Sequence, residues 1–237
     1  MDSTLRRTWA EIDMDALAHN YETLRKRIGE NVKFLGVVKA DAYGHGSVQV
    51  SRLLQELGAD YLAVSSIDEA IELRHNSITM PILILGHTPK EEVGQLIKNN
   101  ITQAVTCKAK ALEYSEEAVR CGGTLKIHIK VDTGMSRLGY LCDGDYFDSG
   151  VEGICEGCSL PGLDAEGIFT HFAPYFAYTL AIPSPMPFDA PVITATFPSN
   201  FPITPRTFLS FLNAKKDTKA FTFVPLCTSP LTIVSSA

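Results

Sequence analysis

Short apolar runs alternate with longer amphipathic stretches along the first 173 residues of the chain. The apolar runs are typical of strands buried on both faces of a sheet. They predict strands over Val32–Val38, Tyr61–Val64, Pro81–Leu85, Gln103–Thr106, Leu125–Val131 and Ala165–Phe172. The stretches between them predict helices over Met14–Ile28, Val48–Leu57, Ile67–Arg74, Lys90–Lys98 and Ala109–Arg120. Strands that alternate with helices pair in parallel, in either an α/β barrel or a doubly wound sheet.

Local signals mark the ends of some of these elements. Asp13 can cap the helix that starts at Met14, and Gly29 lies just past its end. The segment between residues 132 and 164 is rich in glycine, and we expect it to be a connection between two strands.

Residues 174–237 differ in composition from the first part of the chain. All 17 glycines lie before residue 168, whereas ten of the 13 prolines lie at or after residue 174. Prolines at this density exclude a continuous helix or a central strand. The sequence therefore predicts an α/β domain over residues 1–173, followed by an extended, poorly ordered tail over residues 174–237.

Composition and charge narrow the classes of function. A net charge of −6 and a pI near 5.5 offer no basic surface for nucleic acid. No apolar run approaches the ~20 residues that span a bilayer, and no apolar signal segment follows the first arginines. Six cysteines fit reduced thiols, and Cys155 and Cys158 lack the further ligands of a metal site. We expect a cytoplasmic protein that binds no nucleic acid, membrane or metal.

Lys39 ends a buried strand and begins a glycine-rich turn, Lys39-Ala40-Asp41-Ala42-Tyr43-Gly44-His45-Gly46. An ammonium group at the end of a buried strand is costly to desolvate. Proteins retain such a lysine where its amine reacts with a carbonyl cofactor. The alternative is a lysine that extends from the strand end into solvent.

Two further candidates follow predicted strands. Arg137 lies on a glycine-containing loop in the run from Lys130 to Tyr140, where its guanidinium can donate paired hydrogen bonds to an anion. His171 ends the last apolar strand. In a parallel barrel the active site forms at the carboxyl ends of the strands. The alternatives are a surface arginine beside a turn and a histidine of the core.

These three motifs, in this order and spacing, resemble the alanine racemase family over residues 6–173. The resemblance implies an α/β fold, namely the N-terminal TIM-like (β/α)8 barrel of that family in incomplete form. It also implies an isomerase that uses pyridoxal 5′-phosphate to interconvert L-alanine and D-alanine, which supplies D-alanine for the cell wall. Ser136 stands where the family usually has a glycine before the arginine.

The resemblance assigns roles to individual residues. Lys39 would hold the cofactor covalently and then act as acid and base on one face of the substrate. Tyr43 would contact the cofactor phosphate, Arg137 its phenolic oxygen, and His171 would lie beside its ring. Lys130 matches a lysine that is carbamylated in some family members. His45 belongs to the motif, and we expect a structural role for it.

Family members are head-to-tail homodimers with a C-terminal β domain, and the partner's domain supplies a tyrosine as the second base. In residues 174–237 we recognise neither this domain nor the phosphate-binding loop and arginine expected from the last two barrel strands. We therefore expect a truncated or impaired racemase whose tail is unrelated to the family. The homodimer is expected from the family, although its usual contacts with the β domain would be missing.

Two other functions fit the same residues. One is the racemisation of another amino acid, such as serine, because the pocket residues that choose the substrate are not recognised here. The other is a non-catalytic pyridoxal-phosphate-binding protein of the same barrel superfamily. Such a protein would need no second domain, but it would lack the run from Ala42 to Gly46.

Overall fold

The computed structural model describes residues 8–30, 32–171, 192–196, 220–224 and 232–235. The strands before residue 173 are β1 (Thr8–Glu11), β2 (Lys33–Val37), β3 (Tyr61–Val64), β4 (Ile82–Ile84), β5 (Ile101–Val105), β6 (Leu125–Asp132), β7 (Tyr140–Leu141) and β8 (Leu163–His171). The helices are α1 (Met14–Ile28), α2 (Lys39–Gly44), α3 (Ser47–Glu56), α4 (Ile67–His75), α5 (Val93–Lys98), α6 (Lys108–Arg120) and α7 (Phe147–Cys158), with 3-10 turns η2 (Lys90–Glu92) and η3 (Gly144–Tyr146).

The alternation of strands and helices predicted from the hydrophobic pattern is confirmed. Each predicted element has ends within about two residues of the structure, apart from the helix predicted over residues 90–98, which divides into η2 and α5. Phe172, the last residue of the last predicted strand, lies outside the described residues. Asp13 caps α1 as expected, since its Oδ1 accepts a hydrogen bond of 2.9 Å from the Ala16 N–H.

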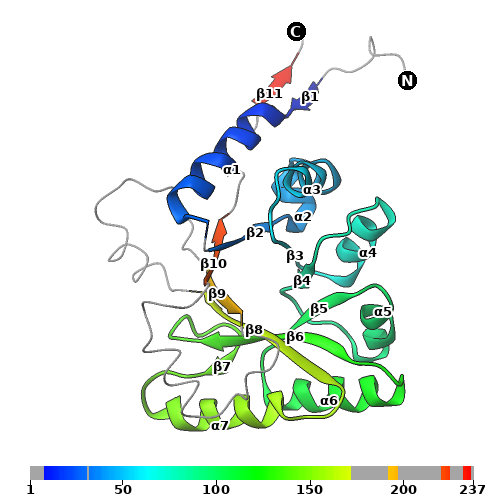
Figure 1. Cartoon of the computed structure of the whole chain (residues 1–237), viewed down its shortest axis with the longest axis vertical. Helices are drawn as coiled ribbons and strands as arrows, with labels where there is room; N and C mark the ends of the chain where they lie inside the picture. The colour runs from blue at the N-terminus through cyan, green and yellow to red at the C-terminus, as the bar shows by residue number, and fades with distance from the viewer. Residues whose placement is uncertain (1–7, 31, 172–191, 197–219, 225–231, 236–237) are drawn as a thin grey trace.

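Six parallel strands form the curved wall of the molecule, with the helices on its outer side (Figure 1). Neighbours pair in the order β2, β3, β4, β5, β6 and β8, and every one of these pairs is parallel. The six strands follow one another in chain order without a reversal. The pairing of β5 with β6 joins the two ends of the strand order β5-β4-β3-β2-β10-β9-β8-β6, in which β9 (Val192–Thr196) and β10 (Ala220–Val224) come from later in the chain. The sheet is therefore a barrel wall rather than a doubly wound sheet. These six strands are the incomplete α/β barrel that the sequence predicts.

Three strands come from the proline-rich tail: β9 (Val192–Thr196), β10 (Ala220–Val224) and β11 (Thr232–Ser235). β9 pairs antiparallel with β8 and β10, and β10 pairs in parallel with β2, so the two strands bridge the gap between β8 and β2. β11 pairs antiparallel with β1 in a separate two-stranded sheet. The expectation that prolines exclude a central strand from this tail was wrong, because β9 and β10 each pair on both sides. The prolines lie between the three strands and not within them. The other tail residues lie outside the described part, and their poor order stays a prediction.

The glycine-rich segment before β8 is not only a connection, because it contains the 12-residue helix α7. A Cβ atom at Gly150 would lie 2.2 Å from the Leu141 carbonyl oxygen, and one at Gly157 would lie 2.9 Å from the Tyr140 hydroxyl. Glycine at these positions lets the helix pack directly against β7. The expectation of a plain connection was wrong because these glycines serve close packing rather than a turn.

Apolar side chains cover both faces of the barrel wall. On the outer face, strand residues such as Phe34 and Leu62 pack in one large cluster with helix residues such as Leu54 and Leu73. The inner face carries a smaller cluster of Leu35, Val37, Tyr61, Ala63, Leu83, Ala104 and Phe169. Successive strand residues contribute to opposite clusters, as the pleat of a strand requires.

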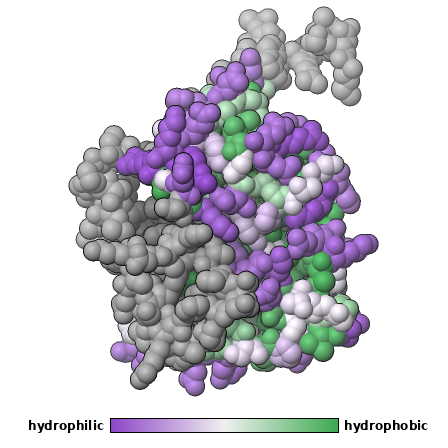
Figure 2. All heavy atoms as spheres, in the orientation of Figure 1, coloured by the Kyte–Doolittle hydropathy of each residue, from purple (hydrophilic) through white to green (hydrophobic). Residues whose placement is uncertain are grey.

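Hydrophilic residues predominate over the described part of the face in Figure 2, with smaller hydrophobic patches between them. Among the described residues, no helix combines the length and apolar character needed to cross a membrane.

Arg74 joins three elements at the amino-terminal end of the barrel. From the last turn of α4, its guanidinium donates to the carbonyl oxygens of Ile78 and Met80, before β4, and of Asn99 and Asn100, before β5, at 2.8–2.9 Å. These carbonyls would otherwise have no strand or helix partner at this rim. One side chain thus fixes the entry of two adjacent strands into the sheet.

Arg74→Met should lower the free energy of unfolding by roughly 2–4 kcal/mol, because four charge-assisted hydrogen bonds are lost and the carbonyls keep their partial burial. Urea denaturation followed by circular dichroism measures this change. Arg120→Met is the matched control, because Arg120 is an exposed arginine paired only with Glu117 on the same helix, and it should cost less than about 1 kcal/mol. Equal losses for the two variants would contradict the role given to Arg74.

Candidate active site

The residues singled out from the sequence lie at the carboxyl ends of the barrel strands. Lys39 follows β2 by two residues, Arg137 lies in the loop after β6, and His171 is the last residue of β8. Lys130 lies within the last three residues of β6. Because β2, β6 and β8 point the same way, all four residues belong to one end of the barrel, which we call the mouth.

Lys39 is half-buried and begins a turn with an unusual backbone. The four residues after it, from Ala40 to Tyr43, have φ between 51° and 57°, so α2 is a left-handed turn. Tyr43 is 42% exposed at its end. The Nδ1 atom of His45 lies 3.1 Å from the carbonyl oxygen of Ala42 inside the turn, and the structural role of His45 stays a prediction.

Asp132 folds the loop that carries Arg137. Its buried carboxylate accepts hydrogen bonds from the backbone N–H groups of Gly134 and Ser136, both at 3.0 Å, and of Arg137 at 2.8 Å. The Arg137 side chain itself is exposed at the mouth. Ser136 has φ of 56°, the left-handed region that glycine enters without strain, which accounts for the glycine usual at this place in the family.

The hydrogen bonds to Asp132 set its charge. Burial by itself would raise the pKa of the carboxyl group, but the three N–H donors and the nearby Lys130 outweigh burial and hold that pKa below its ordinary value. Asp132 is therefore a carboxylate throughout the neutral range. We assigned no role to this aspartate from the sequence, although an aspartate two residues before a glycine in a turn is a known signal for hydrogen bonds to the following N–H groups.

Lys130 is 7% exposed and lies inside the barrel below the mouth. Its Nζ donates to the Val131 carbonyl oxygen at 2.9 Å and lies 5.5 Å from the centre of the Phe169 ring. Burial lowers the pKa of this lysine to about 8, with Asp132 acting against the shift and Arg137 adding to it. A substantial fraction of Lys130 is thus a neutral, nucleophilic amine in mildly alkaline solution.

β8 is tied to β6 where the two strands reach the mouth. The Thr170 hydroxyl donates to the Val131 carbonyl oxygen at 3.0 Å and lies 2.9 Å from the Thr133 hydroxyl. These bonds hold the end of β8 beside the Arg137 loop. His171, the next residue, is half-buried.

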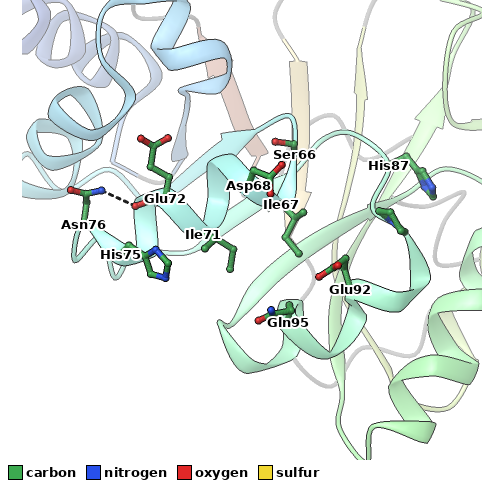
Figure 3. Close-up of a pocket in the computed structure, with 11 residues that line it drawn as sticks. Ser66, Ile67, Asp68, Ile71, Glu72, His75, Asn76, His87, Glu92 and Gln95 are labelled. Atoms are coloured by element: carbon green, nitrogen blue, oxygen red, sulfur yellow. Dashed lines mark hydrogen bonds between the residues drawn. The ribbon is translucent and has the colours of Figure 1, made fainter.

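A groove of about 730 Å³ lies elsewhere, between α4 and the segment of η2 and α5 (Figure 3). Ile67 and Ile71 are among its apolar lining residues, and Asp68, Glu72 and Glu92 are its acidic ones. None of the candidate residues at the mouth lines it. Within the described ranges of the chain, no three His, Cys, Asp or Glu side chains gather in a way that could hold a metal ion.

The fold and mouth define an α/β-barrel protein with a lysine and an arginine presented at the carboxyl ends of its strands. Residues 12–187 match the model of the family described as alanine racemase, N-terminal domain. The chain belongs to the alanine racemase family.

Curated relatives and solved structures agree with this assignment. Alanine racemase 2 of Caldanaerobacter subterraneus subsp. tengcongensis is 43% identical over 173 residues, and alanine racemase of Clostridium perfringens strain SM101 is 46% identical over 173. Each alignment covers 73% of this chain but 44% of the relative. The structure of alanine racemase from Clostridium difficile 630 has a TM-score of 0.67 at 44% identity, covering 71% of this chain and 43% of that one. The chain thus spans less than half the length of each of these three relatives.

Asp132→Asn should lower the free energy of unfolding at pH 7 by roughly 1–3 kcal/mol, because an amide offers one acceptor oxygen to three N–H donors. The folded pKa of Asp132 lies below its ordinary value of 3.8, so its contribution is present above pH 3.8 and is lost as pH falls through the folded pKa. The difference between wild type and variant should therefore shrink in acid. Urea denaturation at a series of pH values measures it, and a pH-independent difference would contradict the charge assignment.

Proposed function

We propose that this chain forms the pyridoxal-phosphate-binding barrel of an alanine racemase, which interconverts L-alanine and D-alanine. The observation that carries the proposal is Lys39, half-buried at the mouth in a strained turn, in a chain of the alanine racemase family. Strained backbone that is retained in a fold often marks a functional position.

The donor groups at the mouth fit pyridoxal phosphate. The Lys39 amine matches the aldehyde, and the Arg137 guanidinium and the Tyr43 hydroxyl match the phenolate and phosphate oxygens. Both Tyr43 and Arg137 are exposed, so their polar ends are accessible to a ligand at the mouth. His171, beside the Arg137 loop, is the candidate for contact with the ring.

Lys39, Arg137 and Asp132 would have different roles in the reaction. Once bound, the cofactor would supply an electron sink that acidifies the Cα proton of the amino acid. The Lys39 Nζ would hold and return that proton on one face of the substrate. Arg137 would keep the phenolic oxygen in its charged form through its own permanent positive charge, while the Asp132 carboxylate keeps the loop of Arg137 folded.

Lys130 would be carbamylated, as its place in the family motif suggests. The ammonium would first lose one proton. The neutral amine would then attack carbon dioxide, forming an N–C bond as one C–O π bond breaks and releasing a second proton, so that a buried cation becomes an anion. The pKa near 8 supports this step, because the reacting species is the unprotonated amine. The resulting carbamate would offer Arg137 an anionic partner.

Some features of the whole enzyme follow from the family alone. Racemisation needs a second base on the opposite face of the substrate, and Lys39 supplies one base. The relatives are more than twice as long as the matched segment. The described residues therefore include no candidate for the second base, and a homodimer in which the partner supplies it is part of the proposal. Free cysteine thiols among the described residues support a reducing, cytoplasmic setting.

Racemisation of serine or another amino acid is the second candidate reaction. Alanine is preferred because curated relatives with 41–46% identity are all described as alanine racemases.

Lys39→Ala should abolish the visible absorbance near ~420 nm that wild-type protein is expected to gain with pyridoxal phosphate, since the lysine amine carries the covalent link. Lys33→Ala, at the opposite end of the same strand, should keep it. Borohydride reduction and mass spectrometry of the digested protein locate the modified lysine. Modification of another lysine at the same level in Lys39→Ala would refute the proposal.

The same preparations should then be given L-alanine and L-serine, and the D-products measured. With one base assigned, we expect the 237-residue chain by itself to racemise slowly, and alanine faster than serine. Turnover equal to that of a full-length relative would contradict this expectation, and a higher rate with serine would favour the second candidate.

Carbamylation of Lys130 should give a carbamate signal in ¹³C NMR spectra of protein incubated with ¹³C-bicarbonate at pH 8. The signal should disappear in Lys130→Met and remain in Lys126→Met, since Lys126 lies on the same strand in an ion pair with Glu166. It should weaken as pH falls below the Lys130 pKa of about 8, where the amine is protonated. A signal of equal size in Lys130→Met would show that another amine reacts.

A further inference from the structure

The backbone after Lys39 adopts an unfavourable conformation that contacts with neighbouring groups must stabilise. Ala40, Asp41, Ala42 and Tyr43 all have left-handed φ and ψ angles, and none of them is glycine. For residues with a Cβ atom this conformation is unfavourable, because it brings the Cβ too close to the following carbonyl oxygen. Four in succession persist only where surrounding groups fix them, so the residues that bind this turn determine where Lys39 projects.

Glu69, in the first turn of α4, binds the beginning of the strained turn. Its Oε1 accepts a hydrogen bond of 2.7 Å from the Ala40 N–H, and its Oε2 accepts from the Ser65 N–H at 2.6 Å and the Ser65 hydroxyl at 2.8 Å. Ala40 follows Lys39 after β2, and Ser65 follows β3. One carboxylate therefore joins the ends of two adjacent strands at the mouth.

The charge of Glu69 fits this use. Its side chain is half-buried, and burial alone would raise its pKa, but the donors from Ser65 and Ala40 hold the pKa of the carboxyl group below the ordinary value. The other end of the turn is held separately, because the Asp41 Oδ1 accepts from the Ser47 N–H at 2.7 Å at the start of α3. Glu69 is thus the group that fixes the end of the turn next to Lys39.

Capping of α4 alone does not explain this geometry. Ser66 and Glu69 have the spacing of a capping box, in which the glutamate binds the N–H of the capping serine. The backbone N–H of Ser66 does interact with Glu69, but the shortest bonds of Glu69 go to Ser65 and to Ala40, 29 residues earlier in the chain. The cap itself is made by the Ser66 hydroxyl, which accepts from the Glu69 N–H at 3.4 Å.

We propose that Glu69 is a positioning residue for Lys39: by holding the Ala40 N–H it sets the direction in which the lysine amine leaves β2. This inference rests on the proposed function, because it concerns the attachment of pyridoxal phosphate. Glu69 does not touch the cofactor, and it acts through the backbone of Ala40. The carboxylate is needed because an amide would present its NH₂ group to one of the two backbone donors.

The test compares Glu69→Gln with Ser66→Ala. Glu69→Gln should weaken covalent pyridoxal phosphate binding about tenfold and shift the pH midpoint of its visible absorbance, because the lysine amine is misplaced. Ser66→Ala removes the helix cap and should lower the free energy of unfolding while leaving both binding and midpoint unchanged. Titration with pyridoxal phosphate over a pH series, with borohydride trapping at Lys39, provides the measurements.

Hydrogen exchange of the peptide containing Ala40 gives a readout without the cofactor, and exchange should be faster in Glu69→Gln than in Ser66→Ala. If Glu69→Gln does not fold, Glu69→Asp, whose shorter side chain cannot span both donors, should show the same weakening. Binding and midpoint equal to wild type in either Glu69 variant would overturn the positioning role. The positioning role would also be overturned if Ser66→Ala lost binding as well, and the losses of binding in all variants simply followed their losses of stability. A wild-type protein that forms no adduct at Lys39 would instead overturn the proposed function, and the positioning role with it.

Discussion

Burial of both faces of the parallel barrel wall is the constraint on which the rest of the structure depends. Residues such as Leu62 and Ala63 are completely buried although they point to opposite sides of the same strand. A strand of this kind is apolar along most of its length, and buried polar side chains such as Gln103 of β5 and His128 of β6 are exceptions. The candidate residues Lys39, Arg137 and His171 lie where β2, β6 and β8 reach the mouth, and the chemistry that we propose belongs to that end.

Once the strands end, their loops need partners for backbone N–H groups, and carboxylates provide them. The Glu69 carboxylate accepts hydrogen bonds from N–H groups just after β2 and β3, and the Asp132 carboxylate accepts three from N–H groups in the loop after β6. In both cases the loop that is held carries a proposed cofactor residue, Lys39 or Arg137. The precision of such a site resides less in those two flexible side chains than in the buried or half-buried carboxylates beneath their loops.

Much of the fold was predictable, because alternating apolar runs and helical periodicity specify a parallel α/β wall. The motif around Lys39 also predicted the family. The left-handed turn was not predictable, since the carboxylate that holds Ala40 belongs to Glu69, 29 residues away in the sequence. Helix α7 was missed because Gly150 and Gly157, which suggest a connection, serve close packing. The strands of the tail were not predicted because prolines are frequent in the sequence around them. Their pairing also depends on the space left between β8 and β2, which the tail sequence does not reveal.

The four carbonyl oxygens bound by Arg74 have a consequence for how this protein can diverge. The guanidinium secures the amino-terminal rim of β4 and β5 with no help from the opposite end of the barrel. Sequence change at one end is therefore largely uncoupled from the integrity of the other. Homologues that keep the Arg74 hydrogen bonds can therefore differ in the residues at the mouth, and in the reaction, while they retain the contacts that hold β4 and β5 in the barrel.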